Sequence, residues 1–156
     1  MRRKIKRRIK IEPDYLYGSF KVSKFINYIM ECGKKNVARK IVYGILEDIK
    51  EKTGNEDPVK VLETAFDNVA PIMEVRSRRI GGATYQVPRE VRPERRLMLA
   101  MGWILEAAQA KKGKPIKERL FDEIMAATKN EGDAMKKKEN THRMAEANRA
   151  FAHFSW

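Results

Sequence analysis

The stretch MEVRSRRIGGATYQVPREVRPERR, from Met73 to Arg96, decides the fold of this chain. Side chains of a strand alternate between two faces, and a pair of glycines tolerates the positive φ of a tight hairpin turn. The pattern therefore predicts strands over residues 73–80 and 83–91, joined at Gly81-Gly82. Arginines fall on both faces of the first strand, so its outer half cannot be buried in an apolar core without unpaired charges.

A ribbon with this pattern must project from the rest of the protein. Eight residues at about 3.3 Å each would carry its tip roughly 25 Å from its base. An isolated hairpin is marginally stable in water, so we expect the ribbon to be mobile until it lies against a partner.

On both sides of the ribbon, apolar residues recur at intervals of three and four, which is the spacing of amphipathic helices. Asp57 precedes Pro58 and is predicted to accept free backbone N–H groups at a helix start. Residues 12–20 are aperiodic and predict an irregular strap against the body, and the lone Cys32 is predicted to be buried. The predicted helices cover residues 22–33, 37–54, 58–71, 93–111, 115–130 and 134–154.

The expected fold class is all-α, a six-helix bundle with one protruding two-stranded β ribbon between the third and fourth helices. A chain of 156 residues fits one domain that can bury a core without disulfides or a metal. Its predicted parts are a flexible basic arm (1–11), helices one to three (12–72), the ribbon (73–91) and helices four to six (92–156).

Positive charge is concentrated in two segments. The formal net charge is +13, from 34 basic and 21 acidic side chains. Residues 1–10 contribute +7 and residues 76–96 contribute +5, so twelve of the thirteen net charges lie in 31 residues. Segments of one sign repel themselves unless a polyanion binds, whereas an ordinary solvated face mixes both signs. Nucleic acid is therefore the predicted partner.

Several side chains are candidates for nucleic-acid contacts on their chemistry alone. Arginines suit phosphates, and an aromatic ring offers a stacking platform for a base. The aromatic tail Phe151, Phe154 and Trp156 could stack on bases, but packing of the last helix is the favoured interpretation. The candidates in the ribbon and in the helices are Arg76, Arg78, Arg79, Arg89, Tyr85, Lys34, Lys35 and Lys136 to Lys138.

Catalytic chemistry finds little support, and no cofactor, metal or small-molecule substrate is expected. His142 and His153 would lie roughly 16 Å apart on an unbroken helix, too far to ligate one metal. Glu139 and His142 have a Glu-x-x-His spacing, but the second copy that a carboxylate di-iron site needs is missing. No helix start follows Gly81-Gly82 to form a phosphate loop. No segment has the length of a membrane span, and no signal peptide is recognised.

Three stretches resemble the bacterial form of the seventh small-subunit ribosomal protein family. They are the ribbon and its exit from Met73 to Arg96, KFINYIMECGKKNVARKIVY (Lys24 to Tyr43) and MAEANRAFAHFSW (Met144 to Trp156). The resemblance implies a structural, non-enzymatic protein, ribosome-bound in the cytoplasm. It implies a primary binder of the 3′ major domain of small-subunit rRNA that nucleates assembly of the subunit head. Neighbouring proteins of the head and platform, the messenger RNA and the exit-site transfer RNA would lie nearby.

The resemblance also assigns roles to residues of this chain. The ribbon tip and part of the last helix would lie near the transfer and messenger RNA, through Gly81, Gly82, Lys136, Lys137, Lys138 and Arg143. The implied rRNA contacts, joined to the candidates above, are Arg2, Arg3, Lys4, Lys6, Arg7, Arg8, Lys10, Lys34, Lys35, Arg76, Arg78, Arg79, Tyr85, Arg89, Arg92, Arg95 and Arg96.

Two alternatives remain open on the residues. An architectural DNA-binding protein is physically possible, because a β ribbon can enter a groove of B-DNA. An RNA-processing enzyme would need a catalytic group that the residue pattern does not offer.

Overall fold

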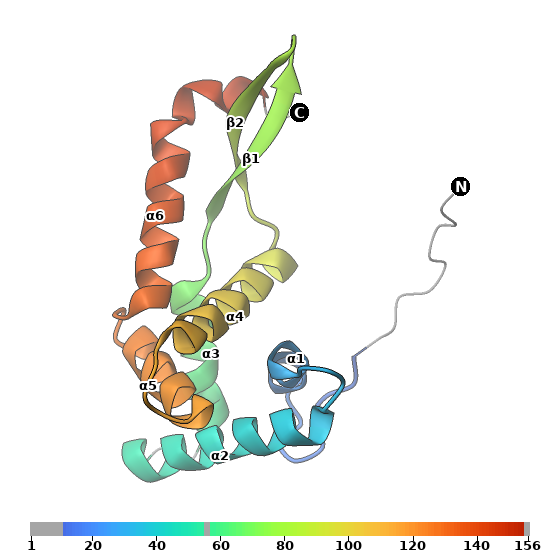
Figure 1. Cartoon of the computed structure of the whole chain (residues 1–156), viewed down its shortest axis with the longest axis vertical. Helices are drawn as coiled ribbons and strands as arrows, with labels where there is room; N and C mark the ends of the chain where they lie inside the picture. The colour runs from blue at the N-terminus through green and yellow to red at the C-terminus, as the bar shows by residue number, and fades with distance from the viewer. Residues whose placement is uncertain (1–10, 55–56, 155–156) are drawn as a thin grey trace, which may run out of the picture.

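The computed structural model describes residues 11–54 and 57–154. In these ranges the chain forms six α-helices, a two-stranded ribbon and a closing 3-10 helix (Figure 1). The predicted fold class and the place of the ribbon between the third and fourth helices are confirmed. The elements are α1 (Phe20–Ile29), α2 (Lys35–Thr53), α3 (Pro58–Val69), β1 (Met73–Ile80), β2 (Ala83–Glu90), α4 (Pro93–Ala110), α5 (Ile116–Thr128), α6 (Asp133–Ala147) and η1 (Arg149–Phe154).

Local sequence signals set most of the helix ends. The Ser19 hydroxyl accepts a hydrogen bond from the Val22 backbone N–H and caps α1. Gly54 ends α2 in the left-handed conformation at φ 62°, which costs glycine little. The cap predicted at Asp57 is wrong: its side chain caps none of the backbone N–H groups of α3 and instead forms an ion pair with Lys60 at 3.1 Å. Pro58 still begins α3.

Helices α1 to α5, which we call the helical body, enclose most of the apolar core. The rings of Phe25 and Phe66 meet edge to face at 5.2 Å between α1 and α3, and both are fully buried. Ile45 and Leu46 of α2 and Ile104 of α4 complete the interior. Each fully buried side chain of this size stabilises the fold by about 1.5–3 kcal/mol.

The segment before α1 is the predicted irregular strap. The Asp14 carboxylate is buried, and it accepts hydrogen bonds from the backbone of Leu16 and Tyr17. The Tyr43 hydroxyl on α2 donates to the same carboxylate at 2.9 Å. One buried acid therefore shapes the strap and attaches it to α2.

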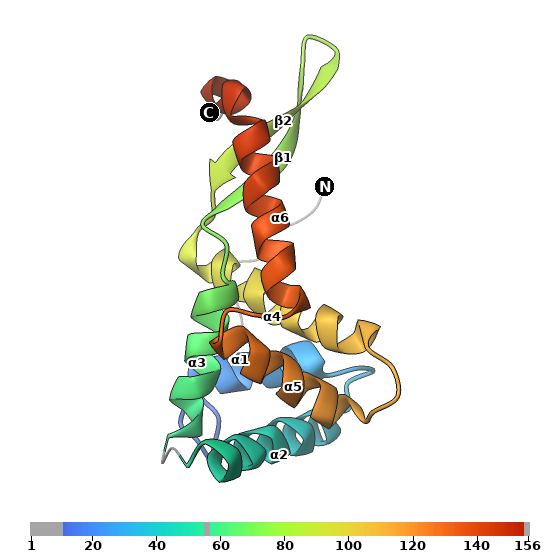
Figure 2. The ribbon, with the colours of Figure 1, turned by 90° about the vertical axis from the view of Figure 1, so that its left-hand side faces the viewer.

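The ribbon projects from the body, and α6 rises beside it (Figures 1 and 2). Its strands are antiparallel with Arg76 opposite Val87 and Arg78 opposite Tyr85. The turn at Gly81 and Gly82 has φ of 56° and 90°. We call β1, β2, α6 and η1 together the ribbon unit. The ribbon is not isolated within the protein, because β1 contacts α6 and β2 contacts η1.

A buried glutamate joins α5 to α6. Glu123 is fully buried; its Oε1 accepts a hydrogen bond from the Ala134 N–H at 2.9 Å, and its Oε2 pairs with Lys111. The contact satisfies a free N–H group in the first turn of α6. Gly132 precedes that turn at φ 100°, and a Cβ there would lie 2.7 Å from Glu123 Oε1. Only glycine fits this joint without displacement.

Two further expectations are corrected. The last helix was predicted to run to residue 154, but α6 ends at Ala147, and the chain turns at Asn148 into η1. Cys32 was predicted to be buried, but it is exposed in the turn after α1, at φ 50°. A turn with two residues of positive φ, Cys32 and Gly33, lies at the surface because its backbone groups need water. Over the described ranges, none of the helices combines the length and apolarity that crossing a membrane requires.

Candidate nucleic-acid interface

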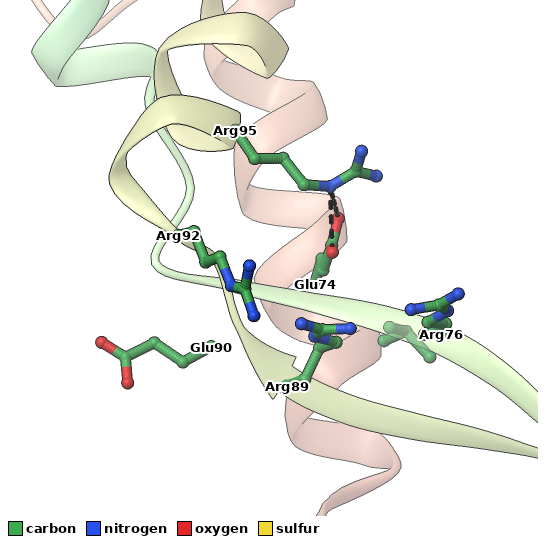
Figure 3. A pocket seen from close by; sticks show the side chains of 7 residues that line it. Glu74, Arg76, Arg89, Glu90, Arg92 and Arg95 are labelled. Atoms are coloured by element: carbon green, nitrogen blue, oxygen red, sulfur yellow. Dashed lines mark hydrogen bonds and ion pairs between the residues drawn. The ribbon is translucent and has the colours of Figure 1, made fainter. Parts of the chain in front are cut away.

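Arginines from β1, β2 and the start of α4 meet where the ribbon joins that helix. Arg89 lies opposite Glu74 in the ladder, and side-chain alternation puts Arg76 on their face of β1. Pro93 begins α4, so Arg92 and Arg95 flank the start of that helix. A cavity of about 530 Å³ opens between these elements (Figure 3). It is lined by Glu74, Val75, Arg76, Arg89, Glu90, Arg92 and Arg95.

Among the residues that the structure describes, a carboxylate neutralises only one of these arginines. Arg95 Nε donates to both oxygens of Glu74, at 3.0 and 2.7 Å. Figure 3 shows Glu90 pointing away from the cluster. Within the described ranges, Arg76, Arg89 and Arg92 form no ion pair. We call these three the arginine cluster; it offers planar, permanently charged donors to a phosphate backbone.

The outer ribbon holds the other predicted contacts. Arg79 is exposed, as are Gly81 and Gly82 at the tip. Arg78 is half-buried, and its Nη1 donates to the Phe154 carbonyl oxygen at 3.4 Å. The Tyr85 ring packs against Phe151 and Phe154, with centroids 5.3 and 5.5 Å away. The described part of the aromatic tail therefore packs, as favoured, but against the ribbon.

The lysines of α6 make internal contacts at the body end of that helix. Lys136 pairs with Asp133 at 2.9 Å, and this hydrogen bond raises the Lys136 pKa. Lys137 pairs with Glu106 of α4. Lys138 Nζ donates to the Asn68 carbonyl at the end of α3, and burial lowers its pKa. The structure does not bring these lysines to the arginine cluster or to the ribbon tip, whereas Arg143, further along α6, is exposed.

The remaining predicted contacts are distributed over other surfaces. Lys34 and Lys35 are exposed where α2 begins. Arg96 is half-buried on α4, and its Nε has no hydrogen-bond partner among the described residues. The predicted contacts from Arg2 to Lys10, and Trp156 of the tail, lie outside the described residues.

The histidines and acids do not assemble a metal site in the described ranges, where no group of three or more potential ligands occurs. His142 Nε2 instead accepts a hydrogen bond from the Ile72 N–H at 3.0 Å, where the chain enters β1. Burial and, secondly, the charge of Lys138 lower the pKa of His142. This contact favours the neutral imidazole, because a protonated ring has no acceptor nitrogen.

Sequence reasoning missed three contacts that shape this region: Glu74 with Arg95, Glu123 with Ala134, and His142 with Ile72. The first was the easiest to anticipate, because Glu74 is an acid within a ribbon of arginines. The other two join residues whose proximity depends on where α6 packs, which no local pattern reports.

Fold and charge together define a helical protein that offers a projecting cationic ribbon to a polyanion. The family model described as Ribosomal protein S7p/S5e matches residues 1–149. The small ribosomal subunit protein uS7 of Thermotoga neapolitana is 59% identical over 156 residues, all of both chains. Its namesake in Thermotoga maritima is 57% identical over the same length. The uS7 protein of Caldanaerobacter subterraneus is 58% identical over 144 residues, 92% of each chain.

The chain belongs to the S7p/S5e family of ribosomal proteins, as the sequence motifs indicated. It is a structural protein of the small ribosomal subunit, ribosome-bound in the cytoplasm, and RNA binding and a part in translation follow from the family.

Proposed function

We propose that this chain is a primary binder of the 3′ major domain of small-subunit rRNA and nucleates assembly of the subunit head. The observation that carries the proposal is the arginine cluster. Arg76, Arg89 and Arg92 converge on one cavity without a carboxylate partner among the described residues, although Glu74 lies beside them and pairs with Arg95. Guanidinium groups held close together without a carboxylate partner repel one another. This repulsion destabilises the free protein unless a polyanion neutralises them.

The mechanism is electrostatic docking followed by recognition of shape. A-form RNA hides its base edges in a deep, narrow major groove, so side chains contact backbone, loops and junctions. The ribbon presents Arg79 and the arginine cluster along its length, and Lys34 and Lys35 extend the contact surface on the body. Neutralising about six phosphates would make the affinity fall roughly 10³-fold between 50 and 200 mM salt.

The tip of the ribbon is the part we place near the exit-site transfer RNA and the messenger RNA. Gly81 and Gly82 are exposed and lack side chains, so their backbone can approach another chain closely. Exposed Arg143 on α6 is a second candidate for this neighbourhood. Lys136 to Lys138 would have to leave their partners Asp133, Glu106 and Asn68 to contribute. Proteins of the head and platform complete the proposed surroundings.

The proposal is tested by removing the arginine cluster. The triple variant Arg76→Gln, Arg89→Gln and Arg92→Gln should bind a 3′ major domain transcript about 30- to 100-fold more weakly at 100 mM salt. The slope of log K against log salt should fall in magnitude by about three, one for each lost phosphate contact.

A matched control removes three exposed lysines that lie elsewhere, Lys40→Gln, Lys112→Gln and Lys129→Gln, with the same change in net charge. It should bind almost as the unaltered protein does. Equal weakening by both triples would show that only net charge matters and would overturn the assignment. Competition with duplex DNA separates the architectural DNA-binding alternative: effective competition at equal nucleotide concentration would favour that alternative.

A further inference from the structure

The ribbon is attached to the C-terminal 3-10 helix at one level along its length. Arg78 and Tyr85 are direct partners in the β ladder, so they share one face of the ribbon. The Tyr85 ring packs against both Phe151 and Phe154, and Arg78 Nη1 donates to the Phe154 carbonyl oxygen. Both strands are therefore held by η1 at the same rung, and the tip extends beyond it (Figure 2).

The geometry of η1 explains how two rings reach one tyrosine. A 3-10 helix has three residues per turn, so residues i and i+3 lie directly above one another. Phe151 and Phe154 have this spacing, and their rings stack at 6.5 Å with planes 14° apart. The turn that starts η1 is closed by the Asn148 side chain, which donates to the Met144 carbonyl at 2.8 Å, and by the Phe151 N–H, which donates to the Asn148 carbonyl. Ending α6 at Ala147 thus directs both rings toward β2.

We propose that η1 is a clasp that sets the direction of the ribbon toward its RNA, with Tyr85, Phe151 and Phe154 as positioning residues. The inference rests on the proposed function of the ribbon as an RNA-binding element. A two-stranded hairpin is marginal by itself, and α6 contacts the ribbon chiefly through β1, so without η1 the outer part of the ribbon would sample many directions. RNA binding would then have to order it, and that ordering reduces affinity. The clasp orders the ribbon in the free protein, so RNA binding does not have to do so.

A network of ion pairs could not anchor the ribbon and also leave its arginines available for RNA. Ion pairs to ribbon arginines would occupy the donors that phosphates need, whereas an aromatic contact leaves the arginine cluster available. The polar contact that Arg78 makes with Phe154 uses a backbone carbonyl as its acceptor.

The test is the double variant Phe151→Leu and Phe154→Leu in the full chain. Two readouts are used. One is amide hydrogen exchange of the free protein at Arg78 and Tyr85, which form a hydrogen-bonded pair of the antiparallel ladder. The other is affinity for the 3′ major domain transcript. Exchange at both amides should accelerate about tenfold, while exchange in α1 to α5 stays unchanged. Affinity should fall about 5- to 10-fold. The salt slope should stay the same, because no cation has been removed and the bound contacts are retained.

The control is Phe20→Leu, the same change on a half-exposed ring of α1. It should alter neither ribbon exchange nor affinity. Unchanged exchange at Arg78 and Tyr85, faster ribbon exchange with full affinity, or a reduced salt slope would each overturn the clasp. Hydrogen exchange is measured without RNA. It therefore tests whether η1 orders the ribbon even if the arginine-cluster variant disproves the proposed RNA site. Loss of the RNA site would then refute only the link between clasp and binding.

Discussion

The helical body and the ribbon unit are stabilised by different forces. In the body, α1 to α5 bury a continuous set of apolar side chains around Phe25 and Phe66. In the ribbon unit, a few specific contacts stabilise the structure. Tyr85 packs against Phe151 of η1, His142 accepts a hydrogen bond from the Ile72 N–H, and Glu123 of α5 accepts one from the Ala134 N–H at the start of α6. A surface that must stay cationic for RNA cannot also be apolar, so it relies on the neighbouring helix for order.

The largest effect should come from the body. Phe66→Ala removes a fully buried ring and leaves a cavity, and it should lower the free energy of unfolding by about 3–5 kcal/mol. Urea denaturation followed by circular dichroism measures this. Leu16→Ala, at a side chain 59% exposed, should change the unfolding free energy by less than about 0.5 kcal/mol. Similar losses for the two variants would contradict the core assigned to α1 to α5.

An intermediate effect is expected at the joint between the two regions. Glu123→Ala leaves the Ala134 N–H and Lys111 Nζ without their acceptor, and it should cost about 2–3 kcal/mol. The unfolding free energy and hydrogen exchange in the first turn of α6 report it. The control Asp122→Ala breaks an exposed ion pair to Lys114 and should cost under about 1 kcal/mol. If both variants lowered the free energy of unfolding equally, the buried Glu123 would have no special role at this joint.

The smallest effect should depend on pH and stay within the ribbon unit. Burial and Lys138 lower the pKa of His142, so the folded state favours the neutral ring. The stabilisation is present above the unfolded pKa of about 6.5 and is lost as the pH falls through the lower folded value. Losing the bond from the Ile72 N–H would cost about 1 kcal/mol and speed exchange of that amide in acid.

Lys138 acts on the charge of His142, and Glu146 and Arg149 line the same pocket; the comparison variant leaves all three in place. His142→Gln offers an acceptor oxygen that does not titrate near neutral pH. Exchange at Ile72, corrected for its intrinsic pH dependence, should then lose the acid response. If the response persists in this variant, another group causes it.

Much of the fold followed from local sequence. Periodicity and the breakers Gly54, Pro58 and Pro93 predicted α2 to α5 close to their observed bounds, because each signal acts within one or two turns. The arginines of the ribbon were named as contacts from their charge and alternation, and they remain the proposed site. The errors at Cys32 and Asp57 arose where a residue's usual preference was overridden by the backbone conformation or by a neighbouring lysine.

The sequence by itself determined the helices, the hairpin and the concentration of positive charge in the ribbon, since these features depend on neighbours along the chain. Only the tertiary structure decided that Arg95 is neutralised by Glu74 while Arg76, Arg89 and Arg92 stay available, and that η1 holds Tyr85. The partners in these contacts are separated by up to 69 positions, as Tyr85 is from Phe154. Local patterns do not encode such contacts, because they depend on the direction in which whole helices pack.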